Sequence, residues 1–532
     1  MYRQNQRRGN LTPPIFRLFF IGCLAFVPSL FALKFPKPTL SGDFSSYFEA
    51  YGSNRATNRR PSTTYRFSLS SSVGFPFFSL GLGLFYTSED KFTSQRVNQF
   101  NLKPAWKWGS IDLGDFSPSF TEYTLSGCQI RGAGISLFPK TFRFSLVGGQ
   151  SNRPDTINKT YKRTLYGLRL GTNLLGLNIL KVKDDEKSLP PTDTGRPQEN
   201  LVVGIESNFY LSSMLNISLE ADGSIHTRDL RSDTFRYEDV PKFIYTFYQP
   251  RRSTRIDYAL KNAVKFNLKF FTLDLAVNQI GPGYTSLGVP YLKNDTRKGR
   301  ITVSTQAIPK TSLSLMLERD YDNLVKDKVA TTKGSAFGIS LRFSPIKKLN
   351  IQTNYNQRTM NKAAASDSFK INNLTRGFLI SPNFAYNLRG INQNSNITFG
   401  YQQFKNSAPI SQLISNHTIT IGLNHYLSPS RSFSISFSFN RSISFLPQAE
   451  RSQSAYNLKF NHKTLGDKLN NSVAVSYSPS TIGKNYRLSA RNGYSLTKRD
   501  VINLDWILNF YSSPGNSFSE RQVSLTYGRR IF

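Results

Sequence analysis

The sequence lacks several features on which common functions depend. It has only two cysteines and four histidines in 532 residues, so neither a disulfide framework nor a histidine-rich metal centre can organise it. After residue 33 it has no run of the roughly 18 apolar residues that a membrane-spanning helix needs. It also has no phosphate-binding glycine loop and no nucleophile motif. We therefore expect no enzymatic activity, no metal and no cofactor.

Basic and aromatic residues are abundant instead. Lysine and arginine number 68 against 33 acidic residues, which gives a net charge of +35, and there are 42 phenylalanines and 26 tyrosines. Richness in aromatic residues favours strands. A basic excess often indicates nucleic acid binding, but we expect no nucleic acid partner for a chain that is exported.

The N-terminus has the layout of an export signal. Three arginines among the first eight residues precede an apolar stretch over 18–33, which ends in small residues near Ala32. We expect a signal peptide over 1–32 and a mature chain over 33–532. A lipoprotein signal ending at Cys23 and a mitochondrial presequence are the alternatives.

Most of the chain repeats a period of two. Phenylalanine or isoleucine alternates with serine over 433–439, and apolar residues alternate with polar ones over 502–510. This alternation predicts strands of about eight to eleven residues with one apolar and one polar face. Short turns containing proline, such as 138–141 and 308–311, separate pairs of strands. Long connections alternate with them at 150–163, 183–199, 223–256, 280–299, 320–334, 357–375, 404–414 and 442–453.

Alternating short and long links predict the topology. They are typical of a single large closed antiparallel transmembrane β-barrel, in which short turns lie on the periplasmic side. Strands counted from 42–51 to 521–528 number about 26, within a range of 22 to 26, and the weakest are near 111–116, 214–222 and 485–491. The alternative is a soluble β-sandwich or propeller, whose packed faces are richer in valine, isoleucine and leucine.

The C-terminal residues, Gln-Val-Ser-Leu-Thr-Tyr-Gly-Arg-Arg-Ile-Phe over 522–532, support the barrel. They resemble the terminal strand of bacterial outer-membrane proteins, which closes on an aromatic residue. The resemblance implies a location in the bacterial outer membrane and insertion by the barrel assembly machinery. It identifies no particular family.

If the apolar face contacts lipid, the alternate residues point into the lumen. The predicted inward acids are Asp112, Glu220, Asp274 and Asp505. The predicted inward bases are Lys103, Lys107, Arg143, Arg169, Lys261, Lys265, Lys269, Arg342, Lys459 and Arg487. Such an excess of positive charge would concentrate anions in a pore. Alternatively, these bases only solvate the lumen and pair with acids of the loops.

Two stretches depart from simple alternation. In 114–132, Asp115 or Glu122 could pair with Arg131 inside the barrel. In 281–290, a segment punctuated by glycine and proline could fold inward and narrow the pore; its candidate residues are Gly281, Gly283, Tyr284 and Gly288. An ordinary surface loop is the alternative for each stretch.

These observations favour a pore or transport conduit. The alternative is a secretion or surface-assembly component whose wide barrel is filled by a periplasmic or secretion partner protein or by an exported polymer. Basic loop residues also predict contacts with phosphates of lipopolysaccharide in the outer leaflet, and these are Arg59, Arg60, Arg251, Arg252 and Arg255.

Overall fold

The computed structural model describes residues 37–55, 57–93, 95–190, 194–236, 242–408, 414–447 and 449–531. The expected signal peptide, 1–32, lies outside these residues. Within them the chain forms 26 strands and four short 3-10 helices. No helix in this part of the chain is long and apolar enough to cross a membrane.

The elements follow one another along the chain with these bounds: β1 Thr39–Ser53, β2 Thr63–Gly74, β3 Phe78–Thr87, η1 Ser88–Phe92, β4 Gln99–Trp106, β5 Gly109–Phe116, β6 Ile130–Leu137, β7 Arg143–Asn152, β8 Arg163–Gly171, β9 Leu175–Asp184, η2 Glu186–Ser188, β10 Glu199–Ser212, β11 Leu215–Thr227, η3 Lys242–Thr246, β12 Thr254–Asn267, β13 Thr272–Ile280, β14 Thr296–Thr305, β15 Thr311–Asp322, β16 Ala330–Ile346, β17 Leu349–Ala364, η4 Asp367–Phe369, β18 Ile371–Leu388, β19 Ile391–Asn406, β20 Ile414–Ser428, β21 Phe433–Leu446, β22 Ala449–Thr464, β23 Leu469–Ser480, β24 Gly483–Ser495, β25 Asp500–Ser513 and β26 Asn516–Ile531.

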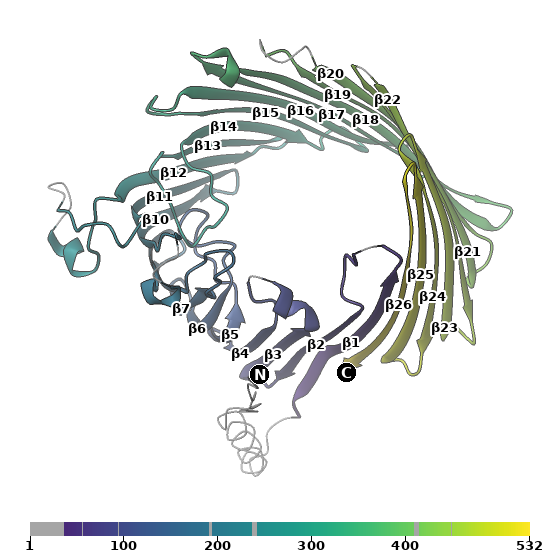
Figure 1. Ribbon diagram of the computed structural model, residues 1–532, viewed down its shortest axis with the longest axis horizontal. Coiled ribbons are helices and arrows are strands. Elements are labelled where there is room, and N and C mark those ends of the chain that lie inside the picture. The colour runs from purple at the N-terminus through teal and green to yellow at the C-terminus, as the bar shows by residue number, and fades with distance from the viewer. Residues whose placement is uncertain are drawn as a thin grey trace, which may run out of the picture.

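The strands form one closed sheet. Each strand pairs antiparallel with the next along the chain, and β1 pairs with β26 from Gly42 opposite Ile531 to Ser53 opposite Glu520. Figure 1 shows the resulting ring, with the first and last strands side by side. The predicted all-β closed barrel and its count of 26 strands are confirmed.

The two faces of the wall differ in polarity. Large apolar side chains such as Phe437, Trp506 and Phe510 are 37%, 49% and 50% exposed on the outward face. Polar residues such as Ser436 and Asp505 alternate with them and point inward, as the period-two geometry of a strand requires. An apolar band therefore surrounds the barrel.

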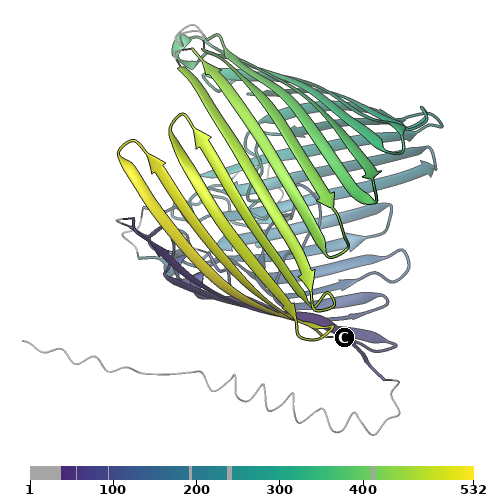
Figure 2. The same ribbon diagram turned by 90° about the vertical axis from the view of Figure 1, so that its right-hand side faces the viewer.

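The two ends of the barrel also differ. Short turns lie at the end that holds the C-terminus, which we call the turn end, and Figure 2 shows this end together with the tilt of the strands. At Arg389 and Gly390 both φ angles are positive, the geometry of a tight two-residue hairpin turn. We call the opposite end, which has the longer connections over most of the chain, the loop end.

Two sequence predictions are wrong, one about a connection and one about the length of the strands. The predicted long link over 442–453 is mostly strand, since β21 runs to Leu446 and β22 begins at its cross-strand partner Ala449, both beyond the apolar alternation. Strands β16 to β19 are also 16 to 18 residues long, well beyond the predicted eight to eleven. The ends of these strands are rich in polar residues without a clear alternation, so their sequence resembles that of a loop. They nevertheless pair with the neighbouring strands.

Candidate functional site

Two connections at the loop end fold back into the barrel (Figure 1). The first docked segment, 117–129, joins β5 to β6, and the second docked segment, 281–295, joins β13 to β14. Their apolar side chains form one buried cluster with inward-facing residues of the wall. The docked segments contribute Phe120, Tyr123, Leu125, Cys128 and Tyr284, and the wall contributes Ile130, Val147, Leu165, Leu180, Val182, Val202, Ala259 and Ile280.

The two docked segments also bind each other. The Tyr284 hydroxyl donates to the Tyr123 carbonyl at 3.0 Å, and the Ser286 hydroxyl donates to the Thr124 carbonyl at 2.6 Å. The Ser126 backbone N–H donates to the Gly288 carbonyl at 3.1 Å. These bonds satisfy backbone groups that could not otherwise be buried, so the segments dock as one unit.

Acids of the inner wall hold the docked segments in place. Glu220 Oε1 accepts a hydrogen bond from the Tyr123 N–H at 2.9 Å, and Asp222 accepts one from the Thr124 hydroxyl. Asp257 Oδ2 accepts from the Gly283 N–H at 2.7 Å. Hydrogen bonds to charged acceptors are stronger than neutral ones, which makes the carboxylates of Glu220 and Asp257 effective anchors.

Asn200 of β10 binds the second docked segment through both the nitrogen and the oxygen of its side-chain amide. Its Nδ2 donates to the Thr285 carbonyl at 2.9 Å, and its Oδ1 accepts from the Leu287 N–H at 3.0 Å. Asn200 itself is fully buried. The amide therefore fixes the register of the segment against the wall.

Burial keeps the phenols of the docked segments neutral. Desolvation raises the pKa of Tyr123 and of Tyr284 well above the usual value, and nearby carboxylates raise both further. The Tyr284 hydroxyl thus remains a hydrogen-bond donor to the first segment at any physiological pH.

All four residues of the predicted constriction lie in the second docked segment. A Cβ at Gly288 would lie 2.6 Å from Leu180 Cδ2 and 3.0 Å from the Thr124 carbonyl oxygen, so a side chain there would have to displace the buried Leu180. A Cβ at Gly281 would collide with the Asp257 carboxylate, whereas Gly283 has more space. The glycines thus allow close approach to the wall rather than flexibility.

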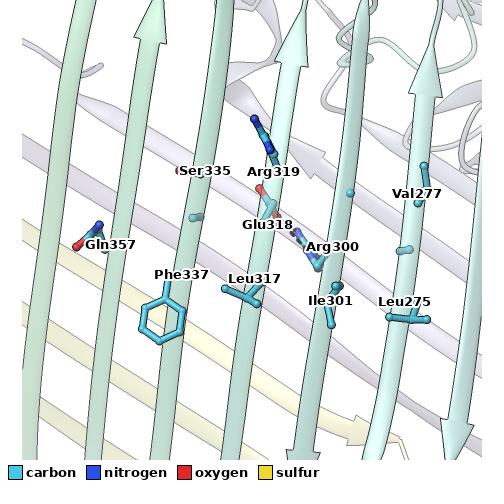
Figure 3. Close-up of a pocket in the computed structure, with 13 residues that line it drawn as sticks. Leu275, Val277, Arg300, Ile301, Leu317, Glu318, Arg319, Ser335, Phe337 and Gln357 are labelled. Carbon is cyan, nitrogen blue, oxygen red and sulfur yellow. Dashed lines mark hydrogen bonds and ion pairs between the residues drawn. The ribbon is translucent and has the colours of Figure 1, made fainter.

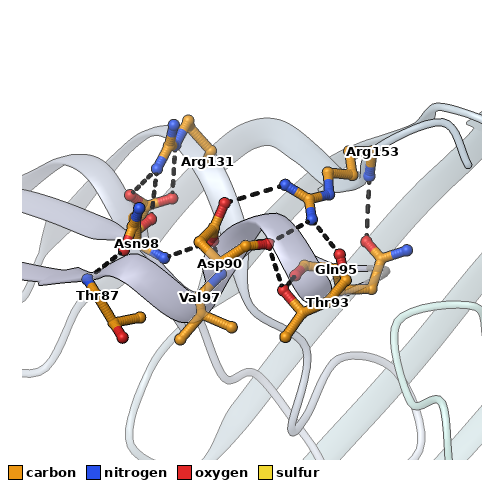
Figure 4. Close-up of polar contacts among 9 residues, drawn as sticks. Thr87, Asp90, Thr93, Gln95, Val97, Asn98, Arg131 and Arg153 are labelled. Atoms are coloured by element: carbon orange, nitrogen blue, oxygen red, sulfur yellow. Dashed lines mark hydrogen bonds and ion pairs between the residues drawn. The ribbon is translucent and has the colours of Figure 1, made fainter. Parts of the chain in front are cut away.

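A polar cluster at the loop end fixes the connection between β3 and β4 (Figure 4). Asp90 accepts hydrogen bonds from the N–H groups of Val97 and Asn98 at 2.5 and 2.9 Å, and it pairs with Arg153 at 3.2 Å. Burial raises the pKa of Asp90, but these three partners together outweigh burial and hold the pKa below its usual value. The carboxylate therefore stays ionised.

Of the three residues predicted to pair, Asp115 and Arg131 do pair, whereas Glu122 has a different partner. Arg131 binds Asp115 through two nitrogens at 2.7 and 2.6 Å, but β6 alternates so that Arg131 shares the outward face with Ala133 and Ile135. Glu122 lies in the first docked segment and pairs with Lys261 of β12. Asp115 lies opposite Arg131 in the register and two residues from the exposed Leu113, so regular alternation places this pair on the outward face and not in the lumen.

Eight of the ten predicted lumen bases lie on strands and on the inward face. Lys107 and Lys269 instead lie in turns, because β4 ends at Trp106 and β12 ends at Asn267. Three inward bases have carboxylate partners: Lys103 pairs with Asp112, Arg169 with Glu206, and Lys261 with Glu122. The remaining inward bases are Arg143, Lys265, Arg342, Lys459 and Arg487.

Sequence reasoning missed further inward bases, most of them near the loop end. Lys298 and Arg300 both bind Glu318, at 2.9 and 2.7 Å. Arg358 pairs with Asp320 at 3.4 Å, and Arg491, nearer the turn end, pairs with Asp505. Lys298 and Arg358 fell in stretches interpreted as loops, although the polar alternation through Asn354 and Asn356 continues to Arg358 and could have shown that the strand extends.

The inner wall of β16 to β24 is free of acids. These nine strands contain one carboxylate, Glu450, which lies opposite Phe445 on the outward face. Of the predicted acids, Asp112 pairs with Lys103, Glu220 holds a docked segment, Asp274 lies opposite Lys265, and Asp505 pairs with Arg491. The described lumen is thus asymmetric, because its inward acids lie outside β16 to β24, and the inward bases of these nine strands have no acid on the same part of the wall.

No group of three or more histidine, cysteine or acidic residues is arranged to hold a metal ion in the part of the chain that the structure describes. Cys128, buried within the first docked segment, is a free thiol whose pKa is raised by burial.

The sequence matches no family model and no curated protein. Among solved structures, the P pilus usher (PapC) translocation pore is similar over 93% of this chain and 99% of that chain, with 10% identity and a TM-score of 0.33. OccAB3 of Acinetobacter baumannii covers 67% of this chain and 98% of its own, with 11% identity and a TM-score of 0.31. OccK5 (OpdH) of Pseudomonas aeruginosa covers 70% and 98%, with 10% identity and a TM-score of 0.30. At these values the likeness supports no argument about function.

Proposed function

We propose that this chain is an outer-membrane pore whose lumen attracts anions, in a role without catalysis. The closed sheet pairs the backbone groups of every strand and leaves no free edge, as a protein in hydrocarbon requires. Its outward band of exposed aromatic and aliphatic residues matches a lipid environment. Insertion would depend on the barrel assembly machinery acting on the C-terminal strand, β26.

The distribution of charge inside the barrel is the observation on which this proposal rests. Glu220, Asp222 and Asp257 are occupied as anchors of the docked segments. Across the lumen, Arg342 and Arg487 have no carboxylate partner on the inner wall of β16 to β24. A permeating ion therefore meets mainly positive charge, which concentrates anions and repels cations.

The reversal potential of the purified protein in a planar bilayer tests the proposal. In a potassium chloride gradient, we expect a sign that indicates preference for chloride, and we expect the preference to weaken as salt is raised. A wild-type pore that conducts but prefers potassium would contradict the charge argument.

The orientation can be checked by labelling single cysteines on intact cells. Asp233 lies in the connection between β11 and β12 at the loop end, and its side chain is 81% exposed. Lys310 lies in the turn before β15. With Cys128 replaced by serine, an impermeant maleimide should label D233C and not K310C, whereas the opposite pattern would show that the barrel is inverted.

The uncharged inner wall of β18 and β19 favours a second candidate function. The barrel would then pass an exported polymer or hold a partner protein. Inward amides pair across strands there, as Asn383 does with Asn394 at 3.0 Å and Asn396 with the Ser381 hydroxyl at 2.8 Å. Such a wall offers hydrogen bonds without strong charge. Failure of the reconstituted wild type to conduct any ion would make this function the leading one.

A further inference from the structure

The outward face of β13 to β17 has an apolar groove with a volume of about 610 Å³. Figure 3 shows Leu275, Ile301, Leu317 and Phe337 lying in a row across four neighbouring strands, as their pairing register requires. Ile301 is 45% exposed and Leu317 is 53% exposed. Side chains on this face contact whatever surrounds the barrel, so the groove fits an acyl chain.

Basic residues lie beyond this row, toward the loop end. Arg319 follows Leu317 by two residues on β15, and Figure 3 shows it on the loop-end side of Leu317. Tyr321 follows in turn, and its cross-strand partners are Arg297 of β14 and Lys333 of β16. Arg297 and Lys333 are therefore diagonal neighbours of Arg319, at roughly 7–8 Å in a twisted sheet. Three cations thus surround Tyr321.

No carboxylate balances these cations on the same face. The acids of β13 to β18 are Asp274, Glu318, Asp320 and Asp322, and their positions alternate with the apolar row, so all four lie on the inward side. Arg376 of β18, beside Gln357, adds a fourth outward cation. The outward charge of these six strands is therefore entirely positive.

The side chain of Arg297 is held in place by a neighbouring residue, whereas the N–H groups of Arg319 and Lys333 are available to bind a ligand. Arg297 donates to Gln279 Oε1 at 2.6 Å, and its guanidinium lies 5.8 Å from the centre of the Tyr321 ring. The side chains of Arg319 and Lys333 form no ion pair or hydrogen bond within the described residues. A guanidinium fork suits phosphate oxygens, and a lysine adds a second point of charge.

We propose that this surface binds a phosphorylated, acylated glycolipid of the outer leaflet, the lipid A part of lipopolysaccharide. Its phosphates contact Arg297, Arg319 and Lys333, and an acyl chain lies over the row from Leu275 to Phe337. The inference rests on the proposed outer-membrane location but does not require that the pore conducts. It also differs from the loop arginines predicted from sequence, since Arg60 pairs with Glu49 and Arg252 with Asp233.

Lipid binding to the purified full-length barrel in detergent tests this site by native mass spectrometry. The variant R297Q/R319Q/K333Q should bind diphosphoryl lipid A about 100-fold more weakly than wild type, because each basic residue beside an anionic lipid contributes roughly fivefold. The control R342Q/K459Q/R487Q removes the same charge from the lumen and should bind lipid A as wild type does.

Three further probes distinguish the sources of phosphate. Dephosphorylated lipid A should bind the wild type as weakly as diphosphoryl lipid A binds the triple variant, and inorganic phosphate alone should not displace bound lipid A. Equal binding of lipid A to wild type and the triple variant would overturn the proposal. So would binding of phosphatidylglycerol as tight as that of lipid A, since the site would then recognise any anionic lipid. Neither result depends on conductance, so both are separate from failure of the pore proposal.

Discussion

Replacing Leu125 with aspartate is expected to detach the docked segments from the wall and to increase the unitary conductance of the barrel. Leu125 exposes none of its surface and lies in the cluster that joins both segments to the wall. An unpaired carboxylate buried there costs several kcal/mol, whereas each hydrogen bond of the segments contributes about 1 kcal/mol. A cost of about 3 kcal/mol would raise the undocked population roughly 100-fold.

Single-channel recording measures this change, and hydrogen exchange of the amides at 120–126 reports whether the segment has detached. The matched control is I157D, since Ile157 is 88% exposed in the connection between β7 and β8. It should change neither quantity. Faster exchange in L125D with unaltered conductance would show that the docked segments do not restrict the lumen.

Replacing inward basic residues that have no acidic partner with glutamate should convert an anion-preferring pore into a cation-preferring one. The variant R342E/K459E/R487E changes three inward residues on three strands of the wall that have no inward acid. Wall charges act on ions within about a Debye length, near 10 Å at 0.1 M salt and 3 Å at 1 M. We therefore expect the reversal potential to change sign at 0.1 M and to change much less at 1 M.

The comparison variant is K107E/K140E/K269E, which makes the same change in charge within the short turns. Lys107 and Lys269 lie beyond their strands, and Lys140 lies in the turn between β6 and β7. Its reversal potential should stay on the anion side. A shift as large as that of the lumen variant would mean that the mouth at the turn end, and not the wall, determines selectivity.

The strands could be predicted because each residue of a barrel wall has one side in the apolar surroundings and one in the lumen. Phe433 to Phe439 and Ile502 to Phe510 show this directly, and the count of 26 strands followed from it. The strand ends were less certain, because they extend past the apolar band. Lys107 and Lys269 were misplaced for this reason, by one and two residues beyond the strand.

The docked segments could be recognised as irregular but not positioned. The bonds that hold them join residues far apart in sequence, such as Tyr123 with Glu220 and Tyr284 with Tyr123. Local alternation contains no information about such partners. The outward cations show the same limit, since Arg297, Arg319 and Lys333 become neighbours only through the register of three strands.

The pairing of β1 with β26 has a consequence for how the barrel forms. Its two strands are separated by almost the whole chain, so the contacts between them span the largest sequence separation of any strand pair. This seam closes only after the C-terminal residues are available. Until then, each incomplete sheet presents two unpaired edges that can recruit other chains. A chain shortened by its last strand would therefore persist as an open, aggregation-prone sheet and not as a smaller barrel.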